Sequence, residues 1–184
     1  MDQIPDEPLT HPKADAAARQ AFRARIAAHE TAGRAIVYID ESGFAHDMPR
    51  TRGYAARGLR CTGLKDWHAR GRVNVIGALL AGALLSAGLT ASNVDADIFN
   101  LWLGRDLLPK LPPAAVLVLD NASFHKRSDT EKLIAGTGHT LEYLPPYSPD
   151  LNKIEPIWAQ AKAVRRRTGQ SVDQLFSCKN WNQN

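Results

Sequence analysis

Residues 35–42 read AIVYIDES and residues 114–121 read AAVLVLDN, and these two stretches decide the fold. Each is a dense apolar run that ends in acid or amide side chains, which is typical of a buried strand that delivers polar groups at its end. Strands buried on both faces need a layer on each side of their sheet. The sequence therefore predicts an α/β fold, with a mixed sheet flanked by helices.

Helices are predicted before and between the strands. Residues 14–30 are rich in Ala and Arg, with apolar side chains spaced by four, which favours an amphipathic helix that ends near Gly33. Ser92 is a candidate N-cap for a second helix, which the prolines in residues 109–113 should stop. A polar helix is expected at 128–135.

Several short strands and a last helix complete the predicted order. A second strand is expected around residues 43–45, and apolar runs at 72–80 and 83–89 predict two further antiparallel strands in a meander. A short strand is expected at 140–144. Asn152 looks like the cap of a final amphipathic helix.

The length of 184 residues and the 44% hydrophobic content predict one globular domain. We expect it to span residues 13–176, between a disordered tail at 1–12 and an irregular end at 177–184. Two cysteines without metal-ligand spacing indicate neither a disulfide framework nor a zinc site. With no export signal and no apolar stretch long enough to span a bilayer, a bacterial cytoplasmic protein is expected.

Three acids stand out by position: Asp40 and Asp120 follow apolar strands, and Glu155 opens a helix. If the two strands are neighbours, their carboxylates converge at one edge of the sheet and repel each other unless cations bind between them. Two divalent ions held in this way can activate water or a 3′-hydroxyl and stabilise the leaving oxygen of a phosphodiester. The acids therefore predict a hard-metal site.

Each acid also has an ordinary structural interpretation. An acid at a strand end is often only a turn former or a helix cap. Asn152 and Glu155 are three residues apart at a helix start, so Glu155 fits equally well as the return partner of a capping box. The chemistry of the residues alone leaves both interpretations open.

The sequences around the acids are more specific. VYIDESGF, LVLDNASFHK and LPPYSPDLNKIEPIW together closely resemble the catalytic motifs of DDE transposases of the mariner-like superfamily. The 34 residues between Asp120 and Glu155 are similar to the spacing of one branch of that superfamily. The resemblance covers roughly residues 14–176.

The resemblance implies a ribonuclease H-like catalytic core, like that of retroviral integrases, with Asp40, Asp120 and Glu155 as metal-binding catalytic residues. It implies two divalent cations, Mg²⁺ with Mn²⁺ as a substitute. The expected activity is strand cleavage at the ends of a mobile element and strand transfer into target DNA at TA dinucleotides. The expected partners are double-stranded DNA and further copies of the chain.

Other residues of these motifs have a secondary place in the expected site. Asn121 fits a turn, and His125 fits either a position near the metals or a helix cap. Residues 147–150 are expected to shape the loop that places Glu155. Glu41 should point to the opposite face from Asp40 if the strand continues, so it is left out of the triad.

Basic residues suggest where DNA lies, although a solvated surface is the simpler alternative. The formal net charge is +4, and a long irregular segment carries seven basic residues against Asp47 and Asp66. A second basic group ends the last predicted helix. The candidate DNA contacts are Arg50, Arg52, Arg57, Arg60, Lys65, Arg70, Arg72, Arg165, Arg166 and Arg167.

The chain departs from the family pattern in three places. About thirty residues precede the first strand, too few for the usual helix-turn-helix modules, and Lys153 stands where Pro is usual. At the other end, CKNWNQN loses the amphipathic pattern where similar proteins continue with helices. We therefore expect a separate helix-turn-helix polypeptide or a truncated chain. The alternatives are a catalytically silent fragment that binds DNA or other subunits, and a ribonuclease or repair nuclease with the same core.

Overall fold

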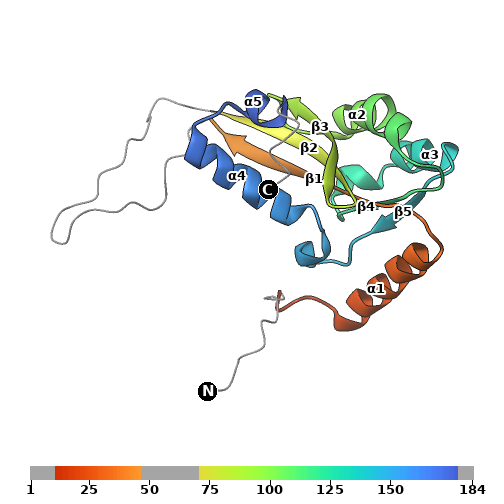
Figure 1. Ribbon diagram of the computed structural model, residues 1–184. Coiled ribbons are helices and arrows are strands. Elements are labelled where there is room, and N and C mark those ends of the chain that lie inside the picture. The colour runs from red at the N-terminus through yellow and green to blue at the C-terminus, as the bar shows by residue number, and fades with distance from the viewer. Residues whose placement is uncertain (1–10, 47–70, 178–184) are drawn as a thin grey trace, which may run out of the picture.

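A computed structural model of the chain describes residues 11–46 and 71–177. Its centre is a five-stranded sheet in the order β3-β2-β1-β4-β5 (Figure 1). The first three strands along the chain pair antiparallel, and β4 and β5 lie parallel to β1. The mixed sheet predicted from the sequence is confirmed. The strands are β1 Ile36–Ala45, β2 Arg72–Leu80, β3 Ala83–Thr90, β4 Val116–Leu119 and β5 Thr140–Tyr143.

Helices cover both faces of this sheet. One face packs against α1, α4 and α5, and the other packs against α2, its π-helical continuation η1, and α3. The predicted helix boundaries near residues 14–30 and 128–135 agree with α1 and α3 to within two residues. The helical elements are α1 Ala16–Thr31, α2 Ala96–Trp102, η1 Leu103–Leu107, η2 Leu108–Lys110, η3 Ser123–Lys126, α3 Ser128–Gly136, η4 Pro149–Leu151, α4 Glu155–Thr168 and α5 Val172–Ser177.

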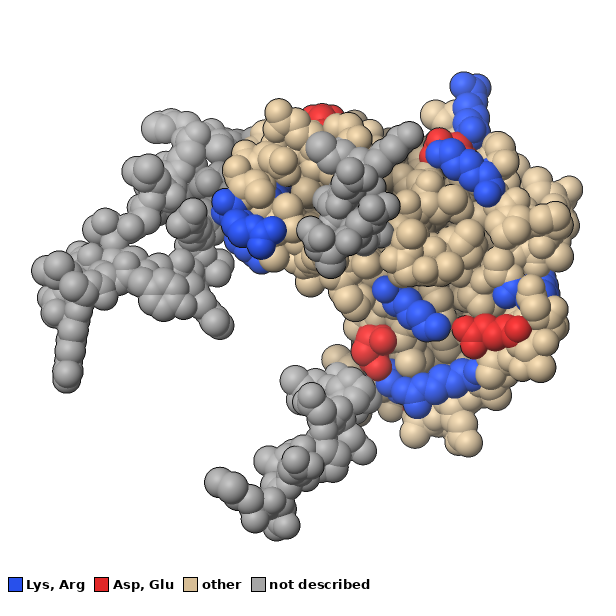
Figure 2. Space-filling view, in the orientation of Figure 1, with Lys and Arg blue, Asp and Glu red and all other residues tan. Residues whose placement is uncertain are grey.

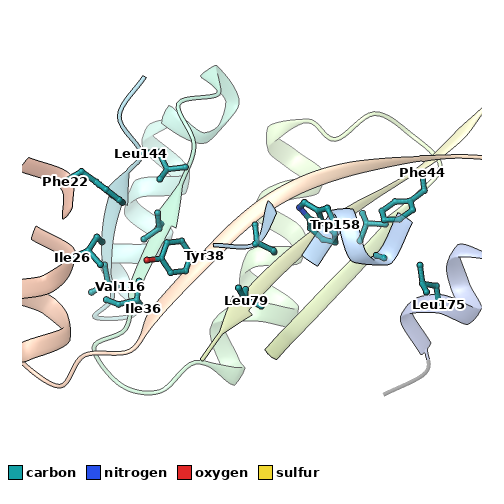
Figure 3. Packing of buried hydrophobic residues seen from close by; sticks show 14 of the residues in the cluster. Phe22, Ile26, Ile36, Tyr38, Phe44, Leu79, Val116, Leu144, Trp158 and Leu175 are labelled. Atoms are coloured by element: carbon teal, nitrogen blue, oxygen red, sulfur yellow. The ribbon is translucent and has the colours of Figure 1, made fainter. Parts of the chain in front are cut away.

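The alternation of side chains along β1 explains why its apolar run is continuous. Ile36 and Tyr38 belong to the core beneath α1 and α4, whereas Val37 and Ile39 belong to the core beneath α2. Figure 3 shows the first of these cores. By the same alternation, Asp40 shares the face of Tyr38.

The separate strand expected at 43–45 is wrong, because these residues continue β1. The strand pairs with β2 from Val37 to Ala45, and Ser42 and Phe44 remain buried along it. Burial of alternate residues beyond the two acids keeps the strand in the sheet. Asp40 therefore lies within β1, opposite Gly77, and not at its end.

The predicted cap of α2 is also wrong. Asp95 is the N-cap, and its carboxylate accepts a hydrogen bond from the N–H of Ile98 at 2.9 Å. The carbonyl of Ser92 accepts instead from the side chain of Asn74. A carboxylate next to the helix start is favoured by the helix dipole, which the sequence pattern did not distinguish from a nearby hydroxyl.

The expected ends of the domain are only partly covered. Residues 1–10 and 178–184 lie outside the described part of the chain, whereas Ser177, expected to be irregular, is the last residue of α5. Among the described helices, none has the length and apolar character needed to cross a bilayer.

Candidate active site

Two of the three acids belong to neighbouring parallel strands: Asp40 lies within β1, and Asp120 directly follows β4. β1 and β4 pair in register up to Tyr38 and Val118, and Asp40 and Asp120 each follow two residues later. Since side chains alternate along a strand, Asp40 continues the face of Tyr38. Asp120 lies just past the end of β4, and its carboxylate contacts His125, which also contacts Glu41. The pairing therefore places Asp40 and Asp120 at the same level of the sheet.

Glu155 approaches Asp40 from α4, of which it is the first residue. The capping-box interpretation is wrong. In a capping box the Glu155 carboxylate would accept a hydrogen bond from the N–H of Asn152, but this N–H donates to the carbonyl of Pro149 at 2.8 Å. Asn152 is not the N-cap either; that position is Ile154, and the Asn152 amide donates to the carbonyl of Ile39 at 3.3 Å. The carboxylate of Glu155 is thus not used as a helix cap, and its negative charge acts on Asp40.

The electrostatics of Asp40 reflect its burial and two nearby carboxylates, those of Glu155 and Glu41. Burial raises the pKa of Asp40 to about 7, and the negative charges of Glu155 and Glu41 add to this shift. The indole N–H of Trp158 opposes it by donating to Asp40 Oδ2 at 3.0 Å. A cation bound between these carboxylates would offset the repulsion between their negative charges.

Trp158 reaches Asp40 because the strand beside it carries a glycine. A Cβ atom on Gly77 would lie 2.4 Å from Trp158 Cη2 and 2.8 Å from Cζ2. Trp158 is 2% exposed and packs against Phe44, so its ring has little room to move (Figure 3). Gly77 therefore leaves room for the indole beside β2, with its N–H at Asp40.

We expect Gly77→Ala to lower the free energy of unfolding by about 1–3 kcal/mol, because an overpacked core must shift the indole or the strand. Gly136→Ala is the matched control, since nothing lies within 4 Å of its added Cβ. Urea denaturation measures both. Equal stability of Gly77→Ala and the wild type would mean that Trp158 is not held as described.

Asp120 is oriented by a buried histidine. His125 is 0% exposed, with its Nδ1 2.7 Å from Asp120 Oδ1 and its Nε2 3.0 Å from Glu41 Oε1. Burial lowers the pKa of His125, but the hydrogen bonds to the two carboxylates outweigh burial and raise the pKa to about 9. At neutral pH the ring is a cation that donates to both acids, and its hydrogen bond holds the pKa of Asp120 below its ordinary value.

Glu41 is the residue that the sequence analysis left out. It does point to the opposite face from Asp40, as predicted, but on that face it meets His125, whose ring is flanked by Phe99 and Phe124 at 4.5 and 4.2 Å between centroids. The sequence feature that could have pointed to Glu41 was its position directly beside Asp40. Alternation places one acid on each face, and only the tertiary structure shows what the second one contacts.

The remaining motif residues tie the strand ends together. The amide of Asn121 donates to the carbonyl of Leu144, which joins the ends of β4 and β5. Tyr147 has a positive φ of 55° and is 53% exposed, and Ser148 Oγ donates to the carbonyl of Pro146 at 3.1 Å. A hollow of about 220 Å³ lies between Asp120 and this loop.

The donor set suits a hard divalent cation, because carboxylate oxygens are the ligands that Mg²⁺ and Mn²⁺ accept readily. In the described residues no three His, Cys, Asp or Glu side chains stand close enough together to hold a metal ion. Asp120 Oδ1 is held by His125 and by the N–H of Ala122. Its side chain is still 44% exposed, which leaves the carboxylate accessible as a ligand.

Most of the predicted DNA contacts cannot be placed: Arg50, Arg52, Arg57, Arg60, Lys65 and Arg70 lie outside the described residues. Arg72 begins β2 and, with Glu41, lines a second hollow of about 400 Å³. Arg165 donates to the carbonyls of His46 and Gln170 at 2.9 and 3.2 Å, so its guanidinium has a structural role within the domain. Arg166 and Arg167 share its helical turn.

The fold matches that of solved transposase catalytic domains. The Mos1 transposase in a paired-end complex with the left transposon end is 13% identical with a TM-score of 0.68, and the match covers 99% of this chain and 61% of that chain. The catalytic domain of Mos1 mariner transposase is 14% identical with a TM-score of 0.58, over 98% of this chain and 88% of that one. The chain thus has the ribonuclease H-like fold that its motifs predicted.

Residues 35–175 match the family described as the DDE superfamily endonuclease, and the chain belongs to that family. A protein of Sinorhizobium fredii (strain NBRC 101917 / NGR234), described as "Uncharacterized protein y4pE/y4sA", is 48% identical over 44 residues. That match covers 24% of this chain and 30% of the relative. The chain therefore spans less than two thirds of the first relatives that it matches.

Proposed function

We propose that this chain is the catalytic domain of a transposase that cleaves DNA strands at the ends of a mobile element and transfers them into target DNA. Asp40, Asp120 and Glu155 are the catalytic residues and the metal ligands in this proposal. The family match and the similarity to Mos1 complexes with transposon ends support it.

One observation carries the proposal: the acids of two separate motifs, Asp40 and Glu155, lie near enough to interact, and the parallel pairing of β1 and β4 puts Asp120 at the same level of the sheet as Asp40. Asp40 and Asp120 follow the parallel pairing of β1 and β4 by equal distances, and Glu155 is near enough to raise the pKa of Asp40. Clustered carboxylates are costly without a cation, so their convergence favours a metal site over three unrelated turn formers.

The chain's own residues would hold and orient two Mg²⁺ ions, with Mn²⁺ as a substitute. Bound there, such ions supply Lewis acidity toward the scissile phosphate and its attacking water or 3′-hydroxyl. Trp158 fixes one oxygen of Asp40, and His125 fixes one oxygen of Asp120. Solved Mos1 paired-end complexes contain Mg and Mn, which supports the choice of metals.

DNA would lie across the edge that carries the acids. Arg72 and Glu41 line the hollow beside the site, and basic side chains gather at the C-terminal end of α4, where Figure 2 shows a blue patch. Contacts of this kind are made to phosphates and carry no base specificity. Selection of the element end and of TA targets would need a helix-turn-helix polypeptide. A homo-oligomer of the chain would join two ends. The reaction would take place on the nucleoid in the bacterial cytoplasm.

A cleavage assay tests the proposal. The purified chain is incubated, with Mg²⁺ or Mn²⁺, with DNA that carries the inverted-repeat ends of the element, with generic DNA and with an RNA–DNA hybrid. We expect metal-dependent nicking of the end-containing DNA. Cleavage of the hybrid alone would make the chain a ribonuclease, and DNA binding without cleavage would make it a silent transposase fragment.

A further inference from the structure

Helix α1 buries an arginine on the side that faces the sheet. Arg19 is 5% exposed and lies on the same stripe as Phe22 and Ile26, which point from α1 into the core (Figure 3). An apolar side chain is the ordinary occupant of such a stripe. A charge in this place needs a partner that compensates for its lost hydration.

The partner is Asp150, in the turn before α4. The two guanidinium nitrogens donate to the two carboxylate oxygens, Nη1 to Oδ1 at 2.8 Å and Nη2 to Oδ2 at 2.6 Å. A two-point contact fixes the direction of both groups. Because well-packed apolar residues often stabilise a fold as much as a buried ion pair does, this pair is better explained by the position it imposes.

Backbone hydrogen bonds connect the turn that holds Asp150 to Glu155. The N–H of Asn152 donates to Pro149 at 2.8 Å, and the N–H of Glu155 donates to the carbonyl of Asn152 at 3.2 Å. The intervening Ile154 is fully buried. A displacement of Asp150 would therefore be passed to the first residue of α4.

A second contact holds the other side of the turn. Asn152 is 3% exposed, and its amide donates to the carbonyl of Ile39, the residue before Asp40. The turn is thus fixed to β1 beside Asp40 and to α1 through Arg19. Two such contacts are useful where Asp40 and Glu155 repel each other and would otherwise move apart.

We propose that the Arg19–Asp150 pair is a positioning device that, through the turn before α4, holds Glu155 beside Asp40 before any cation binds. The inference rests on the proposed function, since it takes Glu155 and Asp40 as metal ligands. Arg19 and Asp150 are not among the proposed metal ligands; the guanidinium and the carboxylate bind each other. They act through the backbone of the turn, as residues that orient metal ligands commonly do.

The test uses the rise in melting temperature with Mn²⁺ concentration, which needs no catalytic turnover. We expect Arg19→Met and Asp150→Asn each to raise the Mn²⁺ concentration for half-maximal stabilisation roughly tenfold. Arg25→Met is the matched control, because Arg25 lies on the same helix and pairs with Glu142 of β5 at 3.0 Å, but is half exposed. It should keep the wild-type midpoint, and the reversed pair Arg19→Asp/Asp150→Arg should recover part of the loss.

The outcomes separate this inference from the proposed function. Arg19→Met and Asp150→Asn with lower melting temperatures in chelator but wild-type Mn²⁺ midpoints would show a purely structural pair and overturn the inference alone. If Mn²⁺ stabilises the wild type and Glu155→Gln equally, Glu155 is not a ligand and both ideas fall. Asp150→Asn keeps the shape of the turn, so the test does not depend on Arg19→Met folding.

Discussion

Replacing Glu155 with Gln is expected to reduce Mn²⁺-dependent cleavage of end-containing DNA by roughly a thousandfold or more, because a catalytic unit loses most of its rate when one member is removed. Gln keeps the size and the hydrogen-bonding capacity of Glu but is not an anionic ligand. The same change removes one of the charges that raise the pKa of Asp40. Stability in chelator should therefore be unchanged or slightly higher.

Asp97→Asn is the matched control for Glu155→Gln. Asp97 is also an acid in the first turn of a helix, α2, and its side chain is 82% exposed. Its replacement should leave cleavage at the wild-type rate. Cleavage retained by Glu155→Gln would remove Glu155 from the active site, together with the main argument for a transposase over a DNA-binding fragment.

The second large effect is expected at His125. His125→Ala should lower the free energy of unfolding by about 3 kcal/mol, since it removes a buried cation from between two carboxylates and leaves a cavity. Asp120 also loses the group that orients it, so stabilisation by Mn²⁺ should be weaker than in the wild type. Urea denaturation in chelator and melting in Mn²⁺ measure the two parts separately.

His29→Ala provides the comparison for His125→Ala. The ring of His29 is 21% exposed and lies 3.3 Å from one carboxylate, that of Glu142. Its loss should cost about 1 kcal/mol, the net contribution of a typical hydrogen bond, because the ring is only partly buried and contacts a single carboxylate. A loss equally small for His125→Ala would contradict the bridging role assigned to this histidine.

The fold could be predicted because its strands are buried on both faces. Continuous apolar runs at 35–42 and 114–121 have few other structures open to them, and the alternation along β1 correctly separated Asp40 from Glu41. The ends of the strands were harder to predict. Nothing in residues 43–45 shows locally that β2 will pair with them, so the strand appeared to end at the acids.

The proposed catalytic acids were predicted from their motifs, and His125 was given a secondary place beside them, but the other groups that orient them were not predicted. Trp158 and Gly77 are far apart in the sequence, and their contact depends on how α4 crosses the sheet. The Arg19–Asp150 pair joins residues 131 positions apart. Such contacts arise from tertiary packing, which periodicity and local propensity do not describe.

The central claim, that Asp40, Asp120 and Glu155 hold divalent cations, is tested most directly by melting with and without Mn²⁺. An ion that binds only the folded protein stabilises it by mass action, so the wild type should gain about 5–10 °C at a hundredfold excess of Mn²⁺ over its dissociation constant. Asp40→Asn, which keeps an acceptor for the Trp158 N–H, should gain little or nothing. An equal gain in both proteins would show that Asp40 is not a metal ligand and would contradict the account.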